Sequence, residues 1–307
     1  MPSNQPPPPE AEDLARQRLA ARQAKDYELA DRLRTGIAEL GWEVTDSAGG
    51  FSLSARAPKA EAYPTFEAVP AAYGEVDTCA HSLCLAFHGW SEDVERLLAG
   101  VLSSAGKREA AVELVVAVVD GEPSARLLQT VHPTLQRPPV VVTAGQGLGQ
   151  AQALTVAARR ARGRIIHFVE PSLEFGWTLL ETAARVLDDP AVGACGPLGL
   201  VTEDWREFQP APAGEVMALE YLMSVRRADL PGIGEMDPGF RFYRNLDLDF
   251  SRQVVAAGFL LRSYQLPVIR HAHRLWESTP SEERDRLSRR NFNRLLDRWV
   301  RRDGPSS

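Results

Sequence analysis

The sequence has few cysteines, no long apolar run and no excess of positive charge. Its three cysteines, Cys79, Cys84 and Cys195, have neither metal-binding spacing nor an even count for a disulfide framework. We therefore expect reduced thiols and a cytoplasmic protein. No run of about eighteen apolar residues is present, which predicts no transmembrane segment. The first residues, MPSNQPPPPEAED, lack the basic and apolar regions of a secretory signal.

The charge balance argues against a general nucleic-acid-binding protein. The 307 residues carry a net charge of -6, and 44% of them are hydrophobic. An acidic chain cannot release many counterions from a phosphate backbone, so nucleic acid is not the expected partner. The apolar content is sufficient for one sizeable core and a smaller unit.

Composition and periodicity divide the chain into five segments. Proline-rich residues 1–12 are expected to be disordered. Residues 13–56 predict a helical hairpin, in which Asp26 caps a helix that ends at Gly41. Residues 57–80 are expected to form a linker, residues 81–275 the main domain, and residues 276–307 a C-terminal amphipathic helix.

The main domain alternates between strand and helix patterns. Apolar runs predict strands at 83–87, 113–119, 139–143 and 164–169, and helical patterns separate them at 91–102, 150–162 and 178–187. ELVVAVV, at Glu113–Val119, is apolar on both faces, as expected for a buried parallel strand. This order predicts a doubly wound α/β sheet, with ligands bound at the carboxyl ends of its strands.

Polar residues suited to chemistry follow several expected strands. They are Asp120, the Glu170-Pro171-Ser172 run, Asp247 and Asp249, and His271 and His273. Oxygen and imidazole ligands from different strands could hold a metal-bridged diphosphate, and a carboxylate could deprotonate a hydroxyl. Taken singly, each of these residues is more often a solvated residue or a helix cap than a site, and together they make a stronger case. The glycines of GQGLG, at 145–149, do not have the spacing of a dinucleotide or P-loop motif.

The stretch from Leu83 to His273 resembles the family 2 glycosyltransferases, which have the GT-A fold. The resemblance rests on the order of GLGQAQALTVAARRARGRIIHFVEPSLEF, DDPAVGACGPLGL and MDPGFRFYRNLDLDFSRQVVAAGFLLRSYQLPVIRHAHR. It implies a glycosyltransferase that uses a nucleotide-diphosphate sugar donor, a hydroxyl acceptor and Mg²⁺ or Mn²⁺, and that inverts the anomeric centre.

The same resemblance implies roles for individual residues. Asp247 would be the catalytic base, and Asp249 would support it or hold the nearby helix start. Asp120, Glu170 and Ser172 would contact the donor. Glu170, His271 and His273 would be the metal ligands.

Two departures from the family pattern leave an alternative open. Ser172 stands where the family has the second acid of its DxD motif, and Leu246 replaces the acid before Asp247. The alternative function is a catalytically inactive GT-A-like domain that binds a nucleotide-sugar or serves as a scaffold.

The N-terminal segment RQRLAARQAKDYELADRLRTGIAELGWEVTDSAGGFSLS is similar to the C-terminal helical region of cysteinyl-tRNA synthetases. A role in RNA association is one implication. However, the segment from Asp13 to Gly41 contains six basic and five acidic residues. A nearly neutral segment lacks the excess of positive charge that RNA binding requires. We favour a role in protein docking or homo-oligomerisation. The arginine-rich C-terminal helix could lie on an anionic membrane, although packing on the main domain or on a partner protein is the simpler interpretation.

Overall fold

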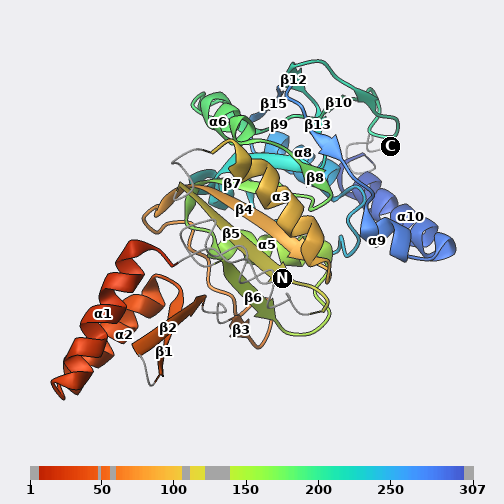
Figure 1. Cartoon of the computed structure of the whole chain (residues 1–307). Coiled ribbons are helices and arrows are strands. Elements are labelled where there is room, and N and C mark those ends of the chain that lie inside the picture. The colour runs from red at the N-terminus through yellow and green to blue at the C-terminus, as the bar shows by residue number, and fades with distance from the viewer. Residues whose placement is uncertain (1–6, 48–49, 56–59, 106–110, 122–138, 301–307) are drawn as a thin grey trace.

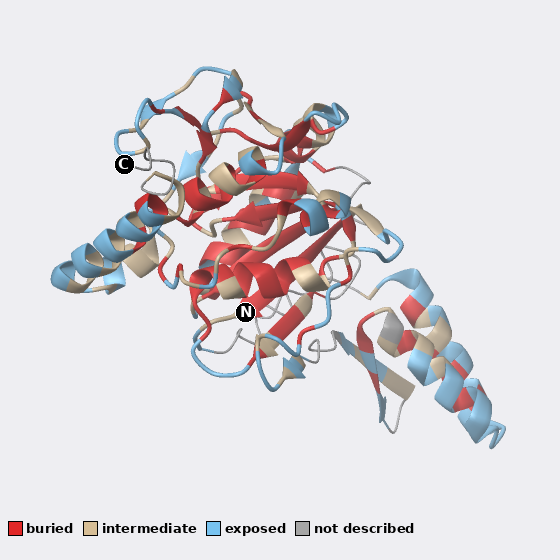
Figure 2. Ribbon diagram, turned by 180° about the vertical axis from the view of Figure 1, so that it is seen from behind, coloured by how far each residue is buried: buried red, intermediate tan, exposed pale blue. Residues whose placement is uncertain are grey.

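The structure, a computed structural model, describes residues 7–47, 50–55, 60–105, 111–121 and 139–300. The first unit contains α1 (Pro9–Gln23), α2 (Tyr27–Glu39), β1 (Trp42–Ser47) and β2 (Gly50–Ala55). The two strands pair antiparallel. This unit stands to one side of the remaining chain in both views of Figures 1 and 2.

The helical hairpin agrees with the expectation and continues into a β-hairpin. Asp26 Oδ1 accepts a hydrogen bond from Leu29 N at 3.0 Å, and Gly41 ends the second helix with a φ of 77°. Helix α1 begins at Pro9, inside the segment expected to be disordered, because proline suits the first helical turn and Ala11 is buried. Residues 1–6 of that segment lie outside the described residues.

This unit has its own small apolar core, formed by Ala11, Ala15, Ile37, Trp42 and Val44. Arg18, which is only 4% exposed, joins helix α1 to the β-hairpin. Its guanidinium donates to both carboxylate oxygens of Asp46, at 2.7 and 3.1 Å, and lowers the pKa of that carboxyl. The core and the buried arginine together hold the four elements as one unit.

The main domain is built on a mixed sheet of nine described strands. Their order is β12-β15-β9-β14-β7-β4-β5-β6-β3. The bounds are β3 (Glu61–Tyr63), β4 (Cys79–Phe87), β5 (Val112–Val118), β6 (Val140–Ala144), β7 (Gly163–Val169), β9 (Val192–Gly196), β12 (Gly214–Val216), β14 (Leu222–Arg226) and β15 (Leu260–Ser263). Strands β3, β6, β5, β4 and β7 run parallel, and β14 runs antiparallel between β7 and β9.

The expected linker contributes an edge strand to this sheet. Strand β3 pairs with β6, and two arginines of the main domain hold the chain that follows it. Arg159 donates to Phe66 O at 2.8 Å, and the Arg227 guanidinium donates to the carbonyl oxygens of Ala72 and Glu75. Segment 60–80 is thus part of the main domain and not a linker. The sequence did not indicate this, because β3 pairs with β6, which is far away in the chain.

Helices cover both faces of the sheet (Figure 1). Helices α3 (Ser91–Ser103) and α6 (Trp177–Val186) pack in one apolar cluster, and α5 (Gln150–Arg160) and α8 (Leu246–Ala256) pack in the other. The buried residues form the central layer in Figure 2. The predicted strands and helices from 83 to 187 all occur, with ends within a few residues of the expected positions.

The remaining elements are short. They are β8 (Leu173–Glu174), β10 (Gly199–Val201), β11 (Gln209–Pro210), β13 (Ala218–Leu219), β16 (Ile269–Arg270), the 3₁₀ turn η2 (Arg227–Asp229), α7 (Leu230–Ile233) and α9 (Arg274–Ser278). Strands β11, β10 and β13 form a small separate sheet, and β16 pairs with β8.

The C-terminal helix α10 (Ser281–Trp299) packs on the main domain. Its buried residues are Asn291, Leu295 and Leu296, and Leu295 belongs to the same apolar cluster as helices α5 and α8. Its apolar stripe is therefore used internally, and its charged face points outward (Figure 2). Within the described chain, no helix combines the length and the apolar composition that crossing a bilayer requires.

A buried polar chain crosses the middle of the sheet. His81 Nδ1 lies 3.0 Å from His167 Nε2, and His167 Nδ1 lies 2.7 Å from Ser224 Oγ. The side chains come from β4, β7 and β14, and His167 is fully buried. Burial lowers the pKa of His81 to about 4 and that of His167 well below its usual value. Both rings are therefore neutral in the folded protein at neutral pH.

The buried pair of neutral histidines, His81 and His167, predicts that the protein loses stability in weak acid. The pKa of His81 is below that of an unfolded histidine, 6.5, so its contribution is present above pH 6.5 and is lost as pH falls towards 4. Between pH 7 and 5 we expect the free energy of unfolding to fall by about 2 kcal/mol from this residue. Urea unfolding of wild type and His81→Gln across this range should show a shallower pH dependence in the variant. Equal slopes would contradict the assignment.

Candidate functional site

Three parallel strands bring polar residues together at one edge of the sheet. Strand β4 pairs with both β5 and β7, so the residues after Phe87, Val118 and Val169 meet at the same edge. Asp120 is exposed there, and its Oδ1 accepts a hydrogen bond from Gly121 N at 2.8 Å. Glu170 follows β7 directly and lines two adjoining pockets. The expected strand-end positions of Asp120 and Glu170 are thus observed.

A short antiparallel pairing brings the two late histidines to the Glu170 loop. Strand β16 pairs with β8, and His271 N donates to Ser172 O at 2.9 Å. His271 Nε2 then lies 2.8 Å from Glu174 Oε2, while His273 Nε2 lies 3.2 Å from Glu170 Oε2. The two histidines therefore belong to two different pairs, and only His273 shares a site with Glu170.

The His273 ring is held between an aromatic side chain and a helix start. Tyr243 stacks on it with the ring centroids 3.7 Å apart. Its Nδ1 accepts a long hydrogen bond, 3.3 Å, from Trp276 N at the start of α9. Among the described residues its buried Nε2 has no aligned hydrogen-bond partner, although it lies close to the Glu170 carboxylate. A buried imidazole nitrogen beside a carboxylate oxygen is a donor set suited to a divalent cation.

The protein side chains alone do not provide a complete set of ligands for a divalent cation. Within the described residues, no three His, Cys, Asp or Glu side chains are grouped as a metal site. Ser172 is 4% exposed, so its side chain is buried rather than presented to the pocket. A cation bound to His273 Nε2 also requires the ring proton to be on Nδ1. A protonated Nδ1 cannot accept the hydrogen bond from Trp276 N, so that bond would be lost. Phosphate oxygens and water would have to supply the other ligands, as is usual for Mg²⁺ sites.

Asp247 lies at the start of helix α8, opposite Glu170 in a shared pocket that Tyr221 and Tyr243 also line. Its Oδ1 accepts from Leu248 N at 3.0 Å and its Oδ2 from Tyr221 N at 3.3 Å. Tyr221 and Asn245, on either side of this carboxyl, both have left-handed backbone, with φ of 60° and 63°. Such strain in residues other than glycine gathers at functional sites, where the surrounding structure holds it.

The electrostatic surroundings suit Asp247 to proton transfer near neutral pH. Burial, and then the neighbouring Glu220 carboxylate, raise its pKa to about 7, against the two backbone N–H groups and Arg244. Part of the residue remains accessible through the pocket. A carboxylate with a pKa near the operating pH is an efficient general base.

Asp249 faces away from the pocket. It is fully buried, its Oδ1 accepts from Trp299 Nε1 at 2.7 Å, and its Oδ2 accepts from the Arg298 guanidinium. Burial raises its pKa to about 6. Residues two apart on a helix point about 200° apart, so Asp247 and Asp249 cannot share one face. Of the two roles expected for Asp249, supporting the base or holding the nearby helix, these contacts favour the second.

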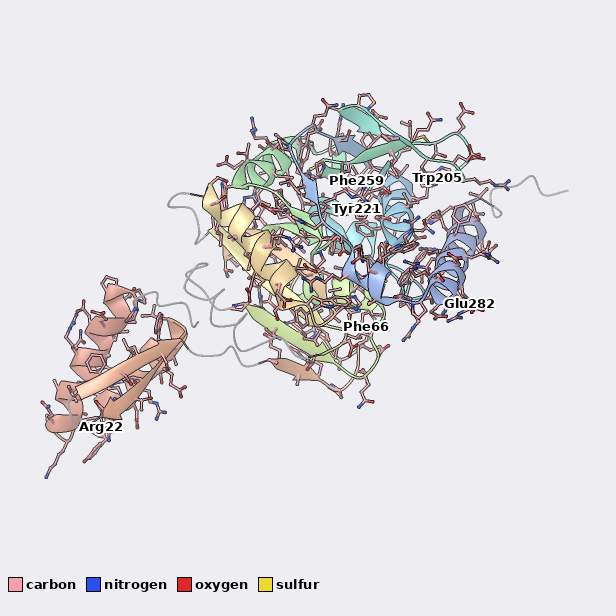
Figure 3. The ribbon with its side chains drawn as sticks, turned by 45° about the vertical axis from the view of Figure 1, so that its right-hand side comes forward. Arg22, Phe66, Trp205, Tyr221, Phe259 and Glu282 are labelled. Carbon is pink, nitrogen blue, oxygen red and sulfur yellow. The ribbon has the colours of Figure 1, made fainter. Side chains whose placement is uncertain are left out.

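Several residues of the site were not among the sequence candidates. His88 Nε2 lies 2.7 Å from Gln150 Oε1, and the ring of Trp90 lies beside that of His88, with centroids 6.4 Å apart. His88, Trp90, Glu170 and His273 line one pocket. His88 and Trp90 could have been found from the sequence, because the run HGW follows the apolar strand directly and so lies at the edge of the sheet where ligands bind. Glu220, Tyr221 and Tyr243 had no comparable signal, because they lie in irregular segments. Figure 3 labels Tyr221 within the main domain.

Comparisons with known proteins give the fold but no family assignment. No family model matches the chain. A cysteine–tRNA ligase of Opitutus terrae is 50% identical over 46 residues, which cover 15% of this chain and 10% of the ligase. This agrees with the likeness of the N-terminal segment and does not extend to the rest of the chain.

Solved structures of glycosyltransferases resemble the main part of the chain. GalNAc-T7 with UDP, GalNAc and Mn²⁺ has a TM-score of 0.50 and 16% identity, and the match covers 72% of this chain and 48% of that one. The mannosyltransferase PcManGT from Pyrobaculum calidifontis, in complex with GDP-Man and Mn²⁺, has a TM-score of 0.48 and 14% identity over 68% of this chain and 58% of that one. S. aureus TarS 1–349 has a TM-score of 0.46 and 14% identity over 73% and 74%.

The chain thus spans about half the length of the GalNAc-T7 chain. At this identity the likeness concerns the fold alone. It agrees with the expected doubly wound α/β sheet. The chain has the GT-A fold of the glycosyltransferases.

Proposed function

We propose that the protein is an inverting glycosyltransferase of the family 2 type, which transfers a sugar from a nucleotide-diphosphate donor to a hydroxyl acceptor. The observation that carries the proposal is the Asp247 carboxyl, whose pKa is raised to about 7 in a pocket that also contains Glu170. With Asp247 as a base and Glu170 assigned to the donor side, the arrangement suits one direct displacement, which inverts the anomeric carbon.

The nucleotide end of the donor would lie over the ends of β4 and β5. Trp90 and His88 offer ring surfaces for a base, and the exposed Asp120 carboxylate can accept hydrogen bonds from ribose hydroxyls. The diphosphate would then extend towards Glu170 and His273, which line the same pocket as His88 and Trp90. Ser172, being buried, is not included in this donor site.

A divalent cation, Mg²⁺ or Mn²⁺, would be held by Glu170 and His273 together with diphosphate oxygens and water. When bound it would stabilise the negative charge of the leaving diphosphate. His271 is left out of this ligand set, since its Nε2 pairs with Glu174. The GalNAc-T7 and PcManGT structures both contain Mn²⁺.

The chain's own groups would carry the remaining steps. Asp247 takes the proton of the acceptor hydroxyl while the hydroxyl oxygen bonds to the anomeric carbon and the bond to the diphosphate breaks. Leu248 N and Tyr221 N hold the carboxylate in place by hydrogen bonds. The apolar side chains of the pocket, including Met223 and Met236, exclude water from the reacting atoms.

A domain that binds a nucleotide-sugar without turnover is the alternative, favoured by the burial of Ser172 at the position of the second DxD acid. We further propose that the N-terminal unit docks on a protein partner or on a second copy. In that unit the side chain of Tyr27 is 58% exposed on helix α2. We also propose a cytoplasmic location, because Cys79, Cys84 and Cys195 are not joined in disulfides.

Replacing Asp247 with asparagine tests catalysis. We expect Asp247→Asn to lower sugar transfer or donor hydrolysis at least 100-fold, because general-base catalysis contributes about 10²–10⁴-fold. Donor binding, measured by thermal shift, should persist. Asp285→Asn is the matched control, since it makes the same substitution at an exposed aspartate of helix α10 and should keep wild-type activity. Donor binding without turnover in the wild type would instead support the binding-only alternative.

The pH dependence tests the environment of Asp247. Its pKa near 7 predicts that kcat/KM rises about tenfold between pH 6 and pH 8, as the base becomes ionised. Glu220→Gln removes a negative charge that raises this pKa, so the midpoint should move to lower pH. An unchanged midpoint in the variant would refute the coupling of the two carboxyl groups.

The histidines distinguish the proposed metal ligands. Nucleotide-sugars of UDP, GDP and dTDP should stabilise the protein in the presence of Mn²⁺, by about 2.7 kcal/mol at one hundred times the dissociation constant. His273→Gln and Glu170→Gln should abolish the Mn²⁺-dependent part of the shift, and His271→Gln should retain it. A loss in His271→Gln equal to that in His273→Gln would overturn this ligand set.

A further inference from the structure

The backbone that presents Asp247 and Tyr243 to the pocket has no regular structure of its own. Residues 234–245, between α7 and α8, belong to no helix or strand. Tyr243 stacks on His273 from within this segment, and Asp247 follows it in the first turn of α8. The backbone groups of such a segment must find their partners elsewhere. The positions of both side chains therefore depend on what holds residues 234–245.

The first part of the segment is held by the start of helix α5. Ala151 N donates to Phe240 O and Gln150 N donates to Arg241 O, each at 3.1 Å. These donors belong to the first turn of α5, where backbone N–H groups have no partners within the helix. They fix the segment as far as Arg241. The residues between Arg241 and Asp247 need other contacts.

A side chain of helix α10 supplies these contacts. Asn291 is 2% exposed, and its Nδ2 donates to Phe242 O at 2.7 Å and to Arg244 O at 2.8 Å. These two carbonyl groups flank Tyr243. A carboxamide nitrogen carries two N–H groups, so one side chain satisfies both carbonyls. An apolar side chain at 291 would leave both without this donor, which is unfavourable for buried groups.

The backbone next to Asp247 is strained, so it needs this support. Asn245 precedes α8 with a φ of 63°, and its side chain makes no capping hydrogen bond. A residue in that position usually has extended backbone and caps the helix with its side chain. Left-handed backbone is unfavourable for residues other than glycine and persists only where surrounding contacts impose it. If the hydrogen bonds from Asn291 are removed, we expect Asn245 to relax and Asp247, two residues later, to move.

We propose that Asn291 is a positioning residue of the site, which holds the backbone on either side of Tyr243 so that Tyr243 and Asp247 face the pocket. Its side chain is not among those that line the two pockets of the site, and so it touches no substrate. Helix α10 also lies outside the stretch that resembles the family 2 enzymes, so the resemblance assigns it no role. The consequence for catalysis rests on the proposed transferase function, whereas the hydrogen bonds do not.

The titration of the Asp247 carboxyl tests this role without requiring turnover. It can be followed by ¹³C NMR of protein labelled at its aspartate carboxyl carbons, in which Asp247→Asn identifies the resonance. Burial and the neighbouring Glu220 carboxylate raise the pKa of Asp247 to about 7, against two backbone N–H groups and Arg244, and each effect depends on where the carboxyl lies. Asn291→Leu and Asn291→Ala should therefore lower the titration midpoint by about one pH unit or more, towards the ordinary pKa of 3.8.

Sugar transfer gives a second measurement. The two variants should lower kcat about 10–100-fold, because a reacting group displaced by about 1 Å can cost about that much. Asn293→Leu is the matched control, since it makes the same change at an exposed asparagine of the same helix and should keep the wild-type midpoint and kcat. Leu180→Ala controls for lost stability. Leu180 is fully buried in the apolar cluster of helices α3 and α6, so this variant should unfold at lower temperature and still keep the wild-type midpoint.

The wild-type protein offers a test that requires no variant to fold. Because Asn291 Nδ2 is buried and bound, its hydrogens should exchange with solvent about tenfold more slowly, or slower still, than those of the exposed Asn293. Equal exchange rates would overturn the proposal. An unchanged midpoint in folded Asn291→Leu, or an equal shift in Leu180→Ala, would also overturn it.

These outcomes separate the role of Asn291 from the transferase function. A lowered midpoint in the variants, in a protein whose wild type transfers no sugar, would support the positioning of Asp247 and refute the transferase function. A wild type that transfers sugar, with unchanged kcat and midpoint in Asn291→Leu, would support the transferase function and overturn the role of Asn291.

Discussion

The site depends on how the start of helix α8 is held. Asn291 of α10 is 2% exposed, and its Nδ2 donates to Phe242 O at 2.7 Å and to Arg244 O at 2.8 Å. One turn into α8, Asp249 is bound by Trp299 and Arg298. These contacts come from the C-terminal helix and hold the segment that carries Tyr243, Asn245 and Asp247. The helix therefore supports the proposed base from behind without lining its pocket.

The proposed reaction site contains features that reduce the stability of the folded protein. Asp247 is half-buried near a second carboxylate, Glu220, and lies two residues after Asn245, which has left-handed backbone. Buried charges and strained residues reduce stability, and they persist where the surrounding packing outweighs their cost. The same features give Asp247 a pKa near neutrality. Functional sites commonly reduce the stability of a protein in this way, because activity requires features that packing alone would not favour.

The topology of the sheet also separates the groups proposed for the donor from the neighbours of the proposed base. Parallel strands β4, β5 and β7 carry the groups proposed for the donor. Antiparallel strand β14 begins at Leu222, immediately after Glu220 and Tyr221, which neighbour the Asp247 carboxyl. The N-terminal unit has its own core and needs none of these contacts, which agrees with its likeness to part of an unrelated enzyme.

The sequence by itself determined the alternating strands and helices from 83 to 187 and the cap at Asp26, because these follow from local periodicity and local hydrogen bonding. It also predicted that Asp120, Glu170 and Asp247 stand at the ends of elements on one edge. Tertiary structure decided which of those groups meet. The pairing of β16 with β8 assigned His273 to Glu170 and His271 to Glu174, and the packing of α10 took Asp249 out of the pocket. Edge strand β3 and the hydrogen bond from Tyr221 N to the Asp247 carboxylate likewise depend on partners far away in the chain. Such contacts carry no periodic signal, since their energy arises only when distant segments are brought together.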